Sequence, residues 1–316
     1  MILDITIRDC ENIKFHVVPT SPIIKRTRLS PLIADPSLLT PDSSPDGLWH
    51  LFAHSIWGIH HYSSIDGIHF LYENKVISQA LRPYIYKEED TYYLFFEKYN
   101  AWKIIHSILS PQKWQSSIAY IYSKDLIHWS SSSMLMSPIM PYHRDPLGDA
   151  IGNPCVLKDK GRYLFYYSSS LLHIADCGFN EPRYVSLAIS DTLLGGYIHL
   201  PTPILSPLHD KQFCNLGAGS LKVIKVRDGF IGFQNCINEI AGKSGSSIWL
   251  LHSTDGIIWS YFQDSPILEP THGWMGSHIY ACSPHYYQGR WMLYFNARNH
   301  AHWSKGTEHI GLAIGQ

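Results

Sequence analysis

Short runs of apolar and aromatic residues, separated by polar turns, recur five times along this 316-residue chain. One unit has the apolar run Cys155-Val156-Leu157, a turn that ends at Gly161, and the run Tyr163-Leu164-Phe165. Two such runs around a glycine-containing turn predict a β-hairpin. The predicted hairpin turns fall at Gly47, Asp90, Gly161, Gly229 and Gly289. Each hairpin therefore marks one structural repeat.

Repeats of this length in an all-β chain are typical of a β-propeller, whose blades pack against their neighbours around a central channel. We predict a single domain, residues 1–316: an all-β, five-bladed β-propeller with four-stranded antiparallel blades around a central funnel. The predicted blades cover residues 31–75, 80–133, 145–200, 215–265 and 278–316. The fifth unit lacks a last strand, and an N-terminal strand at residues 13–18 is expected to complete it and close the ring. Two stacked β-sandwiches are the alternative, but they do not explain five matching hairpins.

Composition narrows the class of protein. The formal net charge of −1 argues against a nucleic-acid or anionic-membrane partner. The six cysteines include no C-x-x-C pair, which argues against a zinc or redox motif, and those in strands are expected to be free, buried thiols. The N-terminal residues show no basic, apolar leader, and no stretch is long and apolar enough to span a bilayer. We therefore expect a soluble, reduced, cytoplasmic protein.

Several motifs resemble those of a known enzyme group. Residues 64–69, 123–129 and 253–259 resemble the S-x-D-G/L-x-x-W outer strands of five-bladed glycosidases. Asp35-Pro36 resembles the Asp-Pro that opens blade one in glycoside hydrolase families 43, 32 and 68. Arg144-Asp145-Pro146 is similar to the R-D-P of the invertase and levansucrase group. At the level of blades, the resemblance covers nearly the whole chain.

The resemblance implies acidic residues at the funnel end of the inner strands. Asp35 matches the blade-one carboxylate that activates water or attacks the anomeric carbon; an Asp-Pro at a strand start is otherwise an ordinary turn. In blade three, Asp145 matches by tripeptide and Asp149 lies close to it in the sequence. Strand alignment instead places Asn153 where the family has its aspartate. We expect Asn153 and one of the two aspartates to face the funnel.

Blade four departs from the family pattern. The resemblance implies a general-acid glutamate just before its inner strand, but residues 215–220 contain no acid, and Ser220 is expected to face the substrate instead. A proton donor is normally needed to release a poor leaving group. Glu97, which ends a run of aromatic strand residues, is our first choice for a replacement opposite Asp35, with an ion pair as its alternative role. Glu181, placed in a blade-three loop, is the next candidate for the site.

Other residues are expected near the funnel. Arg82 and Arg298 are placed to hold a carboxylate or phosphate bidentately, or to form structural ion pairs. His54 lies in a predicted funnel loop, where a histidine is an alternative acid. The aromatic candidates for stacking on a sugar ring are Tyr84, Trp102, Trp274 and Tyr280.

The resemblance implies a carbohydrate-active enzyme, a glycosidase or transglycosidase that acts on a small glycoside in the funnel. The expected partner is a small sugar or glycoside, with no nucleic acid and no membrane. No cofactor is expected, although propellers of this type sometimes hold a structural metal ion in the channel. Two alternatives remain open: a biosynthetic enzyme with non-hydrolytic chemistry, such as cyclisation or group transfer, and a ligand-binding propeller without turnover.

Overall fold

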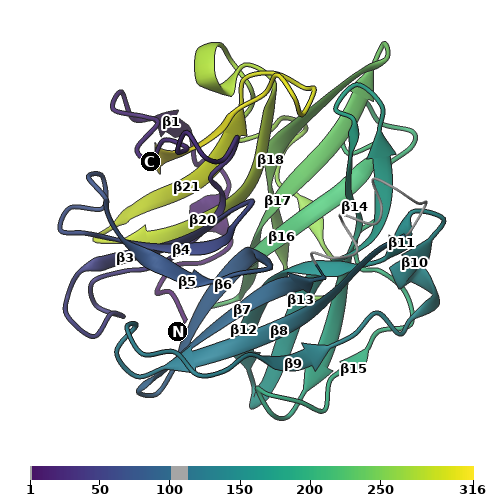
Figure 1. Cartoon of the computed structure of the whole chain (residues 1–316). Helices are drawn as coiled ribbons and strands as arrows, with labels where there is room; N and C mark the ends of the chain where they lie inside the picture. Colours follow the sequence, from purple (N-terminus) through teal and green to yellow (C-terminus); the bar gives the residue numbers. More distant parts are fainter. Residues whose placement is uncertain (1, 101–112) are drawn as a thin grey trace.

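The chain folds into antiparallel groups of four strands arranged around a centre (Figure 1). The computed structural model describes residues 2–100 and 113–316. Blade one is β2–β5 (Ala34–Leu39, Trp49–Ser55, Gly58–Ser64, Leu71–Ile77), and blade two is β6–β9 (Ala80–Glu88, Thr91–Tyr99, Trp114–Ser123, Ser133–Met136). Blade three is β12–β15 (Ile151–Asp159, Arg162–Ile174, Phe179–Ser190, Ile198–His199), and blade four is β16–β19 (Gly217–Val226, Gly229–Ile240, Lys243–Ser253, Ser260–Tyr261). Blade five is β20–β22 (His278–Tyr287, Arg290–Arg298, Glu308–Gly315) together with β1 (Phe15–Val17). The predicted fold class, an all-β five-bladed propeller, is confirmed.

Two features connect the blades. The short strands β10 (Arg144–Asp145) and β11 (Gly148–Asp149) pair with each other, and β11 runs parallel to β8 of blade two. Strand β1 pairs antiparallel with β22, with Phe15 opposite Gly315. An N-terminal strand therefore completes blade five beside the last strand of the chain, and this pairing closes the ring. The described residues also contain three short 3₁₀ helices: Arg8–Cys10, Pro141–His143 and Gly273–Met275.

Each gap between neighbouring blades is filled by its own cluster of buried apolar side chains. Phe52 of blade one and Phe96 of blade two share a cluster, and Trp49 of blade one packs with Tyr294 of blade five. The other gaps hold the pairs Phe95 and Phe165, Tyr166 and Phe230, and Phe233 and Trp291. The second strand of each blade (β3, β7, β13, β17 and β21) is largely buried on both faces, which explains its nearly continuous apolar run.

The S-x-D motifs are structural turns at the ends of the third strands. Ser64 Oγ accepts a hydrogen bond from the amide of Gly67 (3.0 Å), and Asp66 Oδ1 accepts from the amides of Ile68 (2.9 Å) and His69 (2.8 Å). The same pattern recurs at residues 123–128 and 253–258. These residues therefore shape the outer edge of the propeller, away from the funnel.

The cysteines differ in part from expectation. Cys214 and Cys236 form a disulfide, whereas Cys10, Cys155, Cys177 and Cys282 are free and buried. The prediction of free thiols is thus wrong for the pair that joins the entry of β16 to β17. Disulfides persist in oxidising compartments, so the pair argues against the predicted reduced environment. In the part of the chain described, no helix has the length and apolar character needed to cross a membrane.

Candidate functional site

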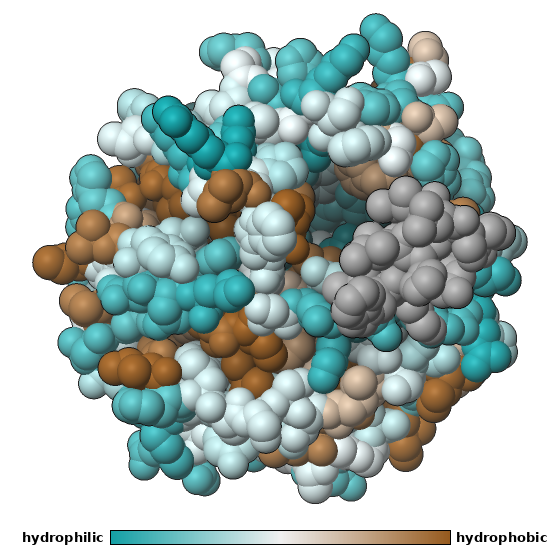
Figure 2. All heavy atoms as spheres, viewed as in Figure 1, coloured by the Kyte–Doolittle hydropathy of each residue, from teal (hydrophilic) through white to brown (hydrophobic). Residues whose placement is uncertain are grey.

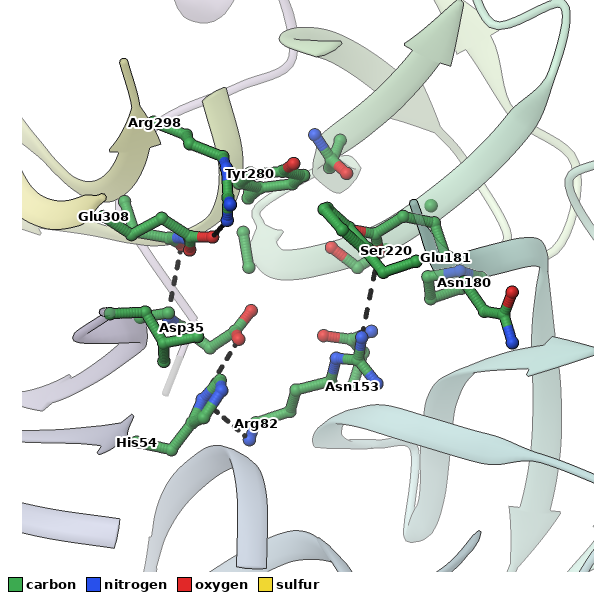
Figure 3. Close-up of a pocket in the computed structure, with 18 of the residues that line it drawn as sticks. Asp35, His54, Arg82, Asn153, Asn180, Glu181, Ser220, Tyr280, Arg298 and Glu308 are labelled. Atoms are coloured by element: carbon green, nitrogen blue, oxygen red, sulfur yellow. Dashed lines mark hydrogen bonds and ion pairs between the residues drawn. The ribbon is translucent and has the colours of Figure 1, made fainter. Parts of the chain in front are cut away.

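A cavity of about 310 Å³ opens at one end of the propeller axis. Polar side chains from all five blades line it, and Figure 3 shows them directed at a common space. The predicted site residues that line the cavity are Asp35, His54, Arg82, Asn153, Glu181, Ser220, Tyr280 and Arg298. These eight residues come from all five blades, and the sequence therefore located part of the cavity wall in each blade.

A repeated β-bulge aims side chains from the inner strands into this cavity. The pairing register shifts near the start of β2, β6 and β12, where Asp35, Arg82 and Asn153 adopt positive φ values of 51°, 53° and 50°. A bulge re-aims a side chain and is common next to active sites. Aspartate and asparagine tolerate this conformation, but an arginine rarely adopts it. Such strain, roughly 1–3 kcal/mol per residue, is typical of functional positions.

Blade four carries a glycine at its bulge. Gly219 has a φ of +59°, and a Cβ there would lie 2.2 Å from the backbone oxygen of Asn235. Asn235 is fixed in turn, because its Nδ2 donates to the backbone oxygen of Ile279 (2.8 Å). A side chain at position 219 would therefore clash with the blade-four wall. Position 219 lies in the segment where the resemblance implies the general acid.

Glu181 reaches the cavity from an extension of blade three. Strands β13 and β14 continue past the sheet as a hairpin in which Leu172 lies opposite Glu181 and Ile174 lies opposite Phe179. Glu181 therefore lies in a strand, not in the loop that the sequence predicted. Burial raises the pKa of Glu181 to about 8, even though Arg82 acts in the opposite direction. A carboxyl group with this pKa holds its proton at neutral pH.

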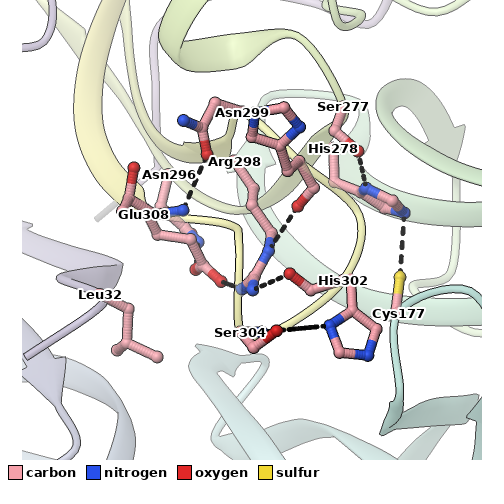
Figure 4. A network of polar contacts seen from close by, with 12 residues as sticks. Leu32, Cys177, Ser277, His278, Asn296, Arg298, Asn299, His302, Ser304 and Glu308 are labelled. Carbon is pink, nitrogen blue, oxygen red and sulfur yellow. Dashed lines mark hydrogen bonds and ion pairs between the residues drawn. The ribbon is translucent and has the colours of Figure 1, made fainter.

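Contacts at its tip hold this hairpin across the funnel. The amide of Trp303 donates to the backbone oxygen of Cys177 (2.9 Å), and the amide of Ser244 donates to Asp176 Oδ2 (2.9 Å). His278 lies beneath the tip, with its Nε2 3.6 Å from Cys177 Sγ (Figure 4). The tip thus binds to blades four and five, which fixes the position of Glu181.

Asp35 is held by a chain of hydrogen bonds that starts in blade five. Its amide donates to Asn296 Oδ1 (3.1 Å), and Asn296 Nδ2 donates to Glu308 Oε2 (2.9 Å). Glu308 also pairs with Arg298 through Oε1 and Nη1 (2.6 Å). The side chain of Asp35 takes no part in this series of hydrogen bonds. Its Oδ2 lies 3.1 Å from His54 Nδ1.

Glu97 does not line the cavity, in contrast to its predicted role as proton donor. Its side chain is 2% exposed, and its Oε2 lies 2.6 Å from Arg82 Nη1. Glu181 Oε2 is farther from the same guanidinium, 3.8 Å from Nη2. Glu97 therefore neutralises Arg82 from below, which limits how strongly Arg82 favours the charged form of Glu181.

His54 and Arg298 are the other candidates for acid and cation roles, and Arg298 forms a structural ion pair, which is its alternative role. Burial lowers the pKa of His54 to about 4, so this histidine is neutral near pH 7 and is a poor proton donor. Each nitrogen of the Arg298 guanidinium donates a hydrogen bond, Nε to the backbone oxygen of His300, Nη1 to Glu308 and Nη2 to the backbone oxygen of His302. It holds the loop after β21 and is not free to clamp an anionic ligand.

Asp145 and Asp149 do not line the cavity. Asp145 Oδ2 accepts hydrogen bonds from Ser170 Oγ (2.7 Å) and the amide of Leu171 (2.6 Å). These bonds fix the start of the blade-three hairpin, so Asp145 supports the site from outside. Asp149 lies in β11 opposite Arg144, on the segment that joins blades two and three.

Of the aromatic candidates in the described residues, Tyr280 lines the cavity, and Tyr84 and Trp274 do not. Tyr280 lines the cavity, and within the described residues its buried hydroxyl has no hydrogen-bond partner. Tyr84 lies deeper, where its hydroxyl donates to the backbone oxygen of Val156 (3.1 Å). Trp274 stacks on Phe295 outside the cavity, and Trp102 lies outside the described residues.

A ring of inner-strand residues lines the channel beneath the site. It surrounds a small cavity of about 70 Å³ and consists of Ser37, Tyr84, Cys155, Lys222 and Ser283, one from each blade. Lys222 Nζ donates to the backbone oxygen of Pro154 (2.8 Å) and lies 5.1 Å from the centre of the Tyr84 ring. Calcium and magnesium prefer carboxylate and carbonyl oxygens. The ring offers no carboxylate and has an amino group in its wall, so it does not fit a channel metal ion.

We expect the melting temperature to be unchanged by EDTA, because the described residues contain no cluster of three metal-ligating side chains and Lys222 helps fill the channel. The measurement is thermal unfolding of the protein before and after dialysis against chelator. A clear fall in melting temperature that added calcium reverses would contradict this expectation.

Several cavity residues were not predicted from the sequence. Among them are Asn180, Asn235, Asn296, Trp303 and Glu308. Asn235 and Asn296 interrupt the apolar runs of β17 and β21, and a polar residue inside a buried run is the signal that could have located them. Glu308 opens β22 after a loop, and nothing in the local sequence indicates that it turns inward.

Comparison with known proteins supports the fold. No protein-family model and no curated protein sequence matches the chain. The structure is similar to the catalytic domain of the Coprinopsis cinerea GH62 α-L-arabinofuranosidase, with a TM-score of 0.70 and 12% identity over 97% of this chain and 98% of that one. It is also similar to an N-acetylgalactosamine deacetylase from F. plautii (TM-score 0.66, 12% identity, 96% and 94% covered) and to the β-1,2-mannobiose phosphorylase of Listeria innocua (0.65, 13%, 96% and 96%). One fold thus hosts different chemistries, so the function has to be argued from the site.

Proposed function

We propose that this protein is a glycosidase or transglycosidase that acts on a small glycoside, with Glu181 as general acid and Asp35 as base or nucleophile. The observation that carries the proposal is the raised pKa of Glu181, about 8, in the cavity that Asp35 also lines. Cleavage of a glycosidic bond uses two carboxyl groups, one protonated and one ionised. In such a pair, the carboxyl group whose environment raises its pKa is assigned as the general acid.

In this mechanism the proton of Glu181 passes to the glycosidic oxygen as the bond to the anomeric carbon breaks. Asp35 then stabilises the positive charge that develops on the sugar, either by attacking the anomeric carbon or by activating the acceptor molecule. Glu97 acts through Arg82. Its Oε2 lies 2.6 Å from Arg82 Nη1, and this negative charge reduces the extent to which the guanidinium favours loss of the Glu181 proton. Where Asp35 has attacked the anomeric carbon, the deprotonated Glu181 next takes a proton from water or another acceptor, whose attack breaks the bond between the sugar and Asp35.

The remaining polar groups suit a ligand that carries many hydroxyls. Tyr280 has a buried hydroxyl with no partner in the described chain, and such a group normally needs an explanation. Asn153 and Ser220 line the same cavity. A bound sugar would satisfy the Tyr280 hydroxyl, and its other hydroxyls would find donors and acceptors on the same wall.

The direct test is a panel of 4-nitrophenyl glycosides, in both anomers, assayed with and without inorganic phosphate. We expect release of nitrophenol from at least one sugar. A sugar phosphate among the products would identify phosphate as the acceptor, and free sugar would identify water. No release from any glycoside, together with no binding of any sugar by calorimetry, would overturn the proposal.

A further inference from the structure

The lining of the cavity changes character from floor to mouth. Polar lining residues such as Asn153 and Glu308 are buried, Asp35, Arg82 and Asn180 are half-buried, and the exposed lining residues are apolar. Ile56 is 44% exposed and Trp303 is 57% exposed. The apolar residues of this mouth are Pro31, Leu32, Ile56, Phe179 and Trp303. In Figure 2 the face seen is hollowed near its middle, with brown residues beside the hollow.

Further apolar surface continues outside the mouth. Leu29 is 78% exposed and Trp57 is 55% exposed, and Trp57 Nε1 donates to the backbone oxygen of Leu29 (2.8 Å). Leu29 is close in sequence to Pro31, and Trp57 directly follows Ile56. Several large apolar side chains exposed together at the entrance of a cavity mark a binding surface rather than scattered surface residues.

The mouth is held by the same elements that position the catalytic groups. Phe179 lies two residues before Glu181 in β14, and the guanidinium of Arg298 lies 5.4 Å from its ring. Trp303 belongs to the loop that Arg298 fixes through the backbone oxygens of His300 and His302. The apolar surface is therefore in place before a ligand arrives, which favours affinity.

The position of Glu181 sets the direction in which a leaving group departs. The space below the floor, at the ring around Lys222, is about 70 Å³, against about 310 Å³ for the cavity, so a bound glycoside has room to extend toward the mouth and not into the channel. Phe179 and Pro182 flank the general acid and line the same cavity. A group bonded to the oxygen that Glu181 protonates would therefore contact the apolar mouth.

We infer that the substrate is a glycoside of an apolar alcohol, alkyl or aryl, and not one sugar unit of a longer chain. This inference rests on the proposed function. A second sugar in the mouth would place hydroxyls against Leu32 and Ile56, which offer no hydrogen bonds, and unpartnered polar groups are unfavourable there. The cavity volume of about 310 Å³ is at the lower end of ligand pockets, about 300–1,000 Å³, and suits one sugar unit on the floor.

The test uses alkyl glycosides, from methyl to hexyl, of the sugar that the panel identifies. A buried methylene contributes about 0.8 kcal/mol, which corresponds to about a 4-fold gain. We expect kcat/KM to rise by about 2–4-fold per methylene over the first few carbons and to exceed that for the matching oligosaccharides. Trp303→Ala and Ile56→Ser should flatten this rise. Ile127→Ala, at a 67% exposed isoleucine on an outer turn, is the matched control and should keep it.

Binding separates a failure of this inference from a failure of the proposed function. The same alkyl series is titrated by calorimetry into the Asp35→Asn variant, in which turnover does not interfere. A rise in affinity with chain length, without any cleavage by the wild type, would support the apolar mouth and overturn the glycosidase. Cleavage with no dependence on chain length, or a preference for oligosaccharides, would overturn the apolar aglycone.

Discussion

Asparagine in place of Asp35 is expected to reduce turnover by roughly 10²–10⁴-fold or more, the range associated with loss of a positioned acid or base. The substitution removes the negative charge and keeps the size of the side chain. The fold should be unaffected, because the amide of residue 35 still donates to Asn296 and asparagine tolerates the φ of 51° at the bulge. The measurements are kcat on the best aryl glycoside and the melting temperature.

Chemical rescue distinguishes a catalytic carboxylate from a structural one. Added azide or formate should restore part of the turnover of Asp35→Asn on an aryl glycoside, since a small anion can occupy the vacated space. Glycine at the same position enlarges that space and should respond more strongly. Activity within a few fold of the wild type would instead make Asp35 only the bulge residue that starts β2.

The repeated pattern explains why the fold was predictable. Each blade contains a hairpin of apolar runs, and the clusters between blades use both faces of those runs, so the periodic signal is strong. Asp35, Arg82 and Asn153 were located because each precedes a proline at the start of an inner strand. Such a proline marks the strand start in the sequence, and the bulge beside it turns the side chain inward.

The acid assignments were less predictable because they depend on contacts between distant segments. Glu97 lies on the strand that the sequence indicated, but its partner Arg82 comes from the neighbouring strand and holds it below the cavity. Pro182 next to Glu181 suggested a loop, whereas β14 continues through it. The contacts of Cys177 with blades four and five, which hold that hairpin over the funnel, leave no mark on the local pattern.

Glutamine in place of Glu181 is expected to have an effect that depends on the leaving group. For an alkyl glycoside, whose leaving oxygen needs a proton, kcat/KM should fall by roughly 10²–10⁴-fold. For a 4-nitrophenyl glycoside the first bond cleavage needs little protonation, so the loss should be far smaller. In the wild type, kcat/KM on alkyl glycosides should fall above pH about 8, where Glu181 loses its proton, and this limb should be absent in the variant.

Glu308→Gln is the matched control, because Glu308 is also a buried carboxyl group of the cavity whose pKa burial raises. Its pair with Arg298 at 2.6 Å would be broken, and loss of one partner of a buried pair destabilises by about 3–5 kcal/mol. We expect a lower melting temperature and similar losses on alkyl and aryl glycosides. Equal losses on both substrates in Glu181→Gln as well would show that Glu181 binds or supports rather than donates a proton.

The pH dependence of stability tests the protonation state of Glu181 independently of activity. A pKa that is higher in the folded than in the unfolded protein makes the free energy of unfolding depend on pH. The folded protein holds the proton up to pH about 8, whereas an unfolded glutamate loses it near its ordinary value of 4.5. Between these values the native state binds more protons, so the stability contributed by this group is present at low pH and is lost as pH rises toward 8.

Glutamine needs no proton to stay neutral, and the Glu181→Gln variant should therefore unfold at a higher temperature than the wild type at pH 8. The difference, of the order of a few kcal/mol at most, should shrink toward pH 5. A difference that does not change with pH would mean that Glu181 is ionised in the native protein and is not the general acid.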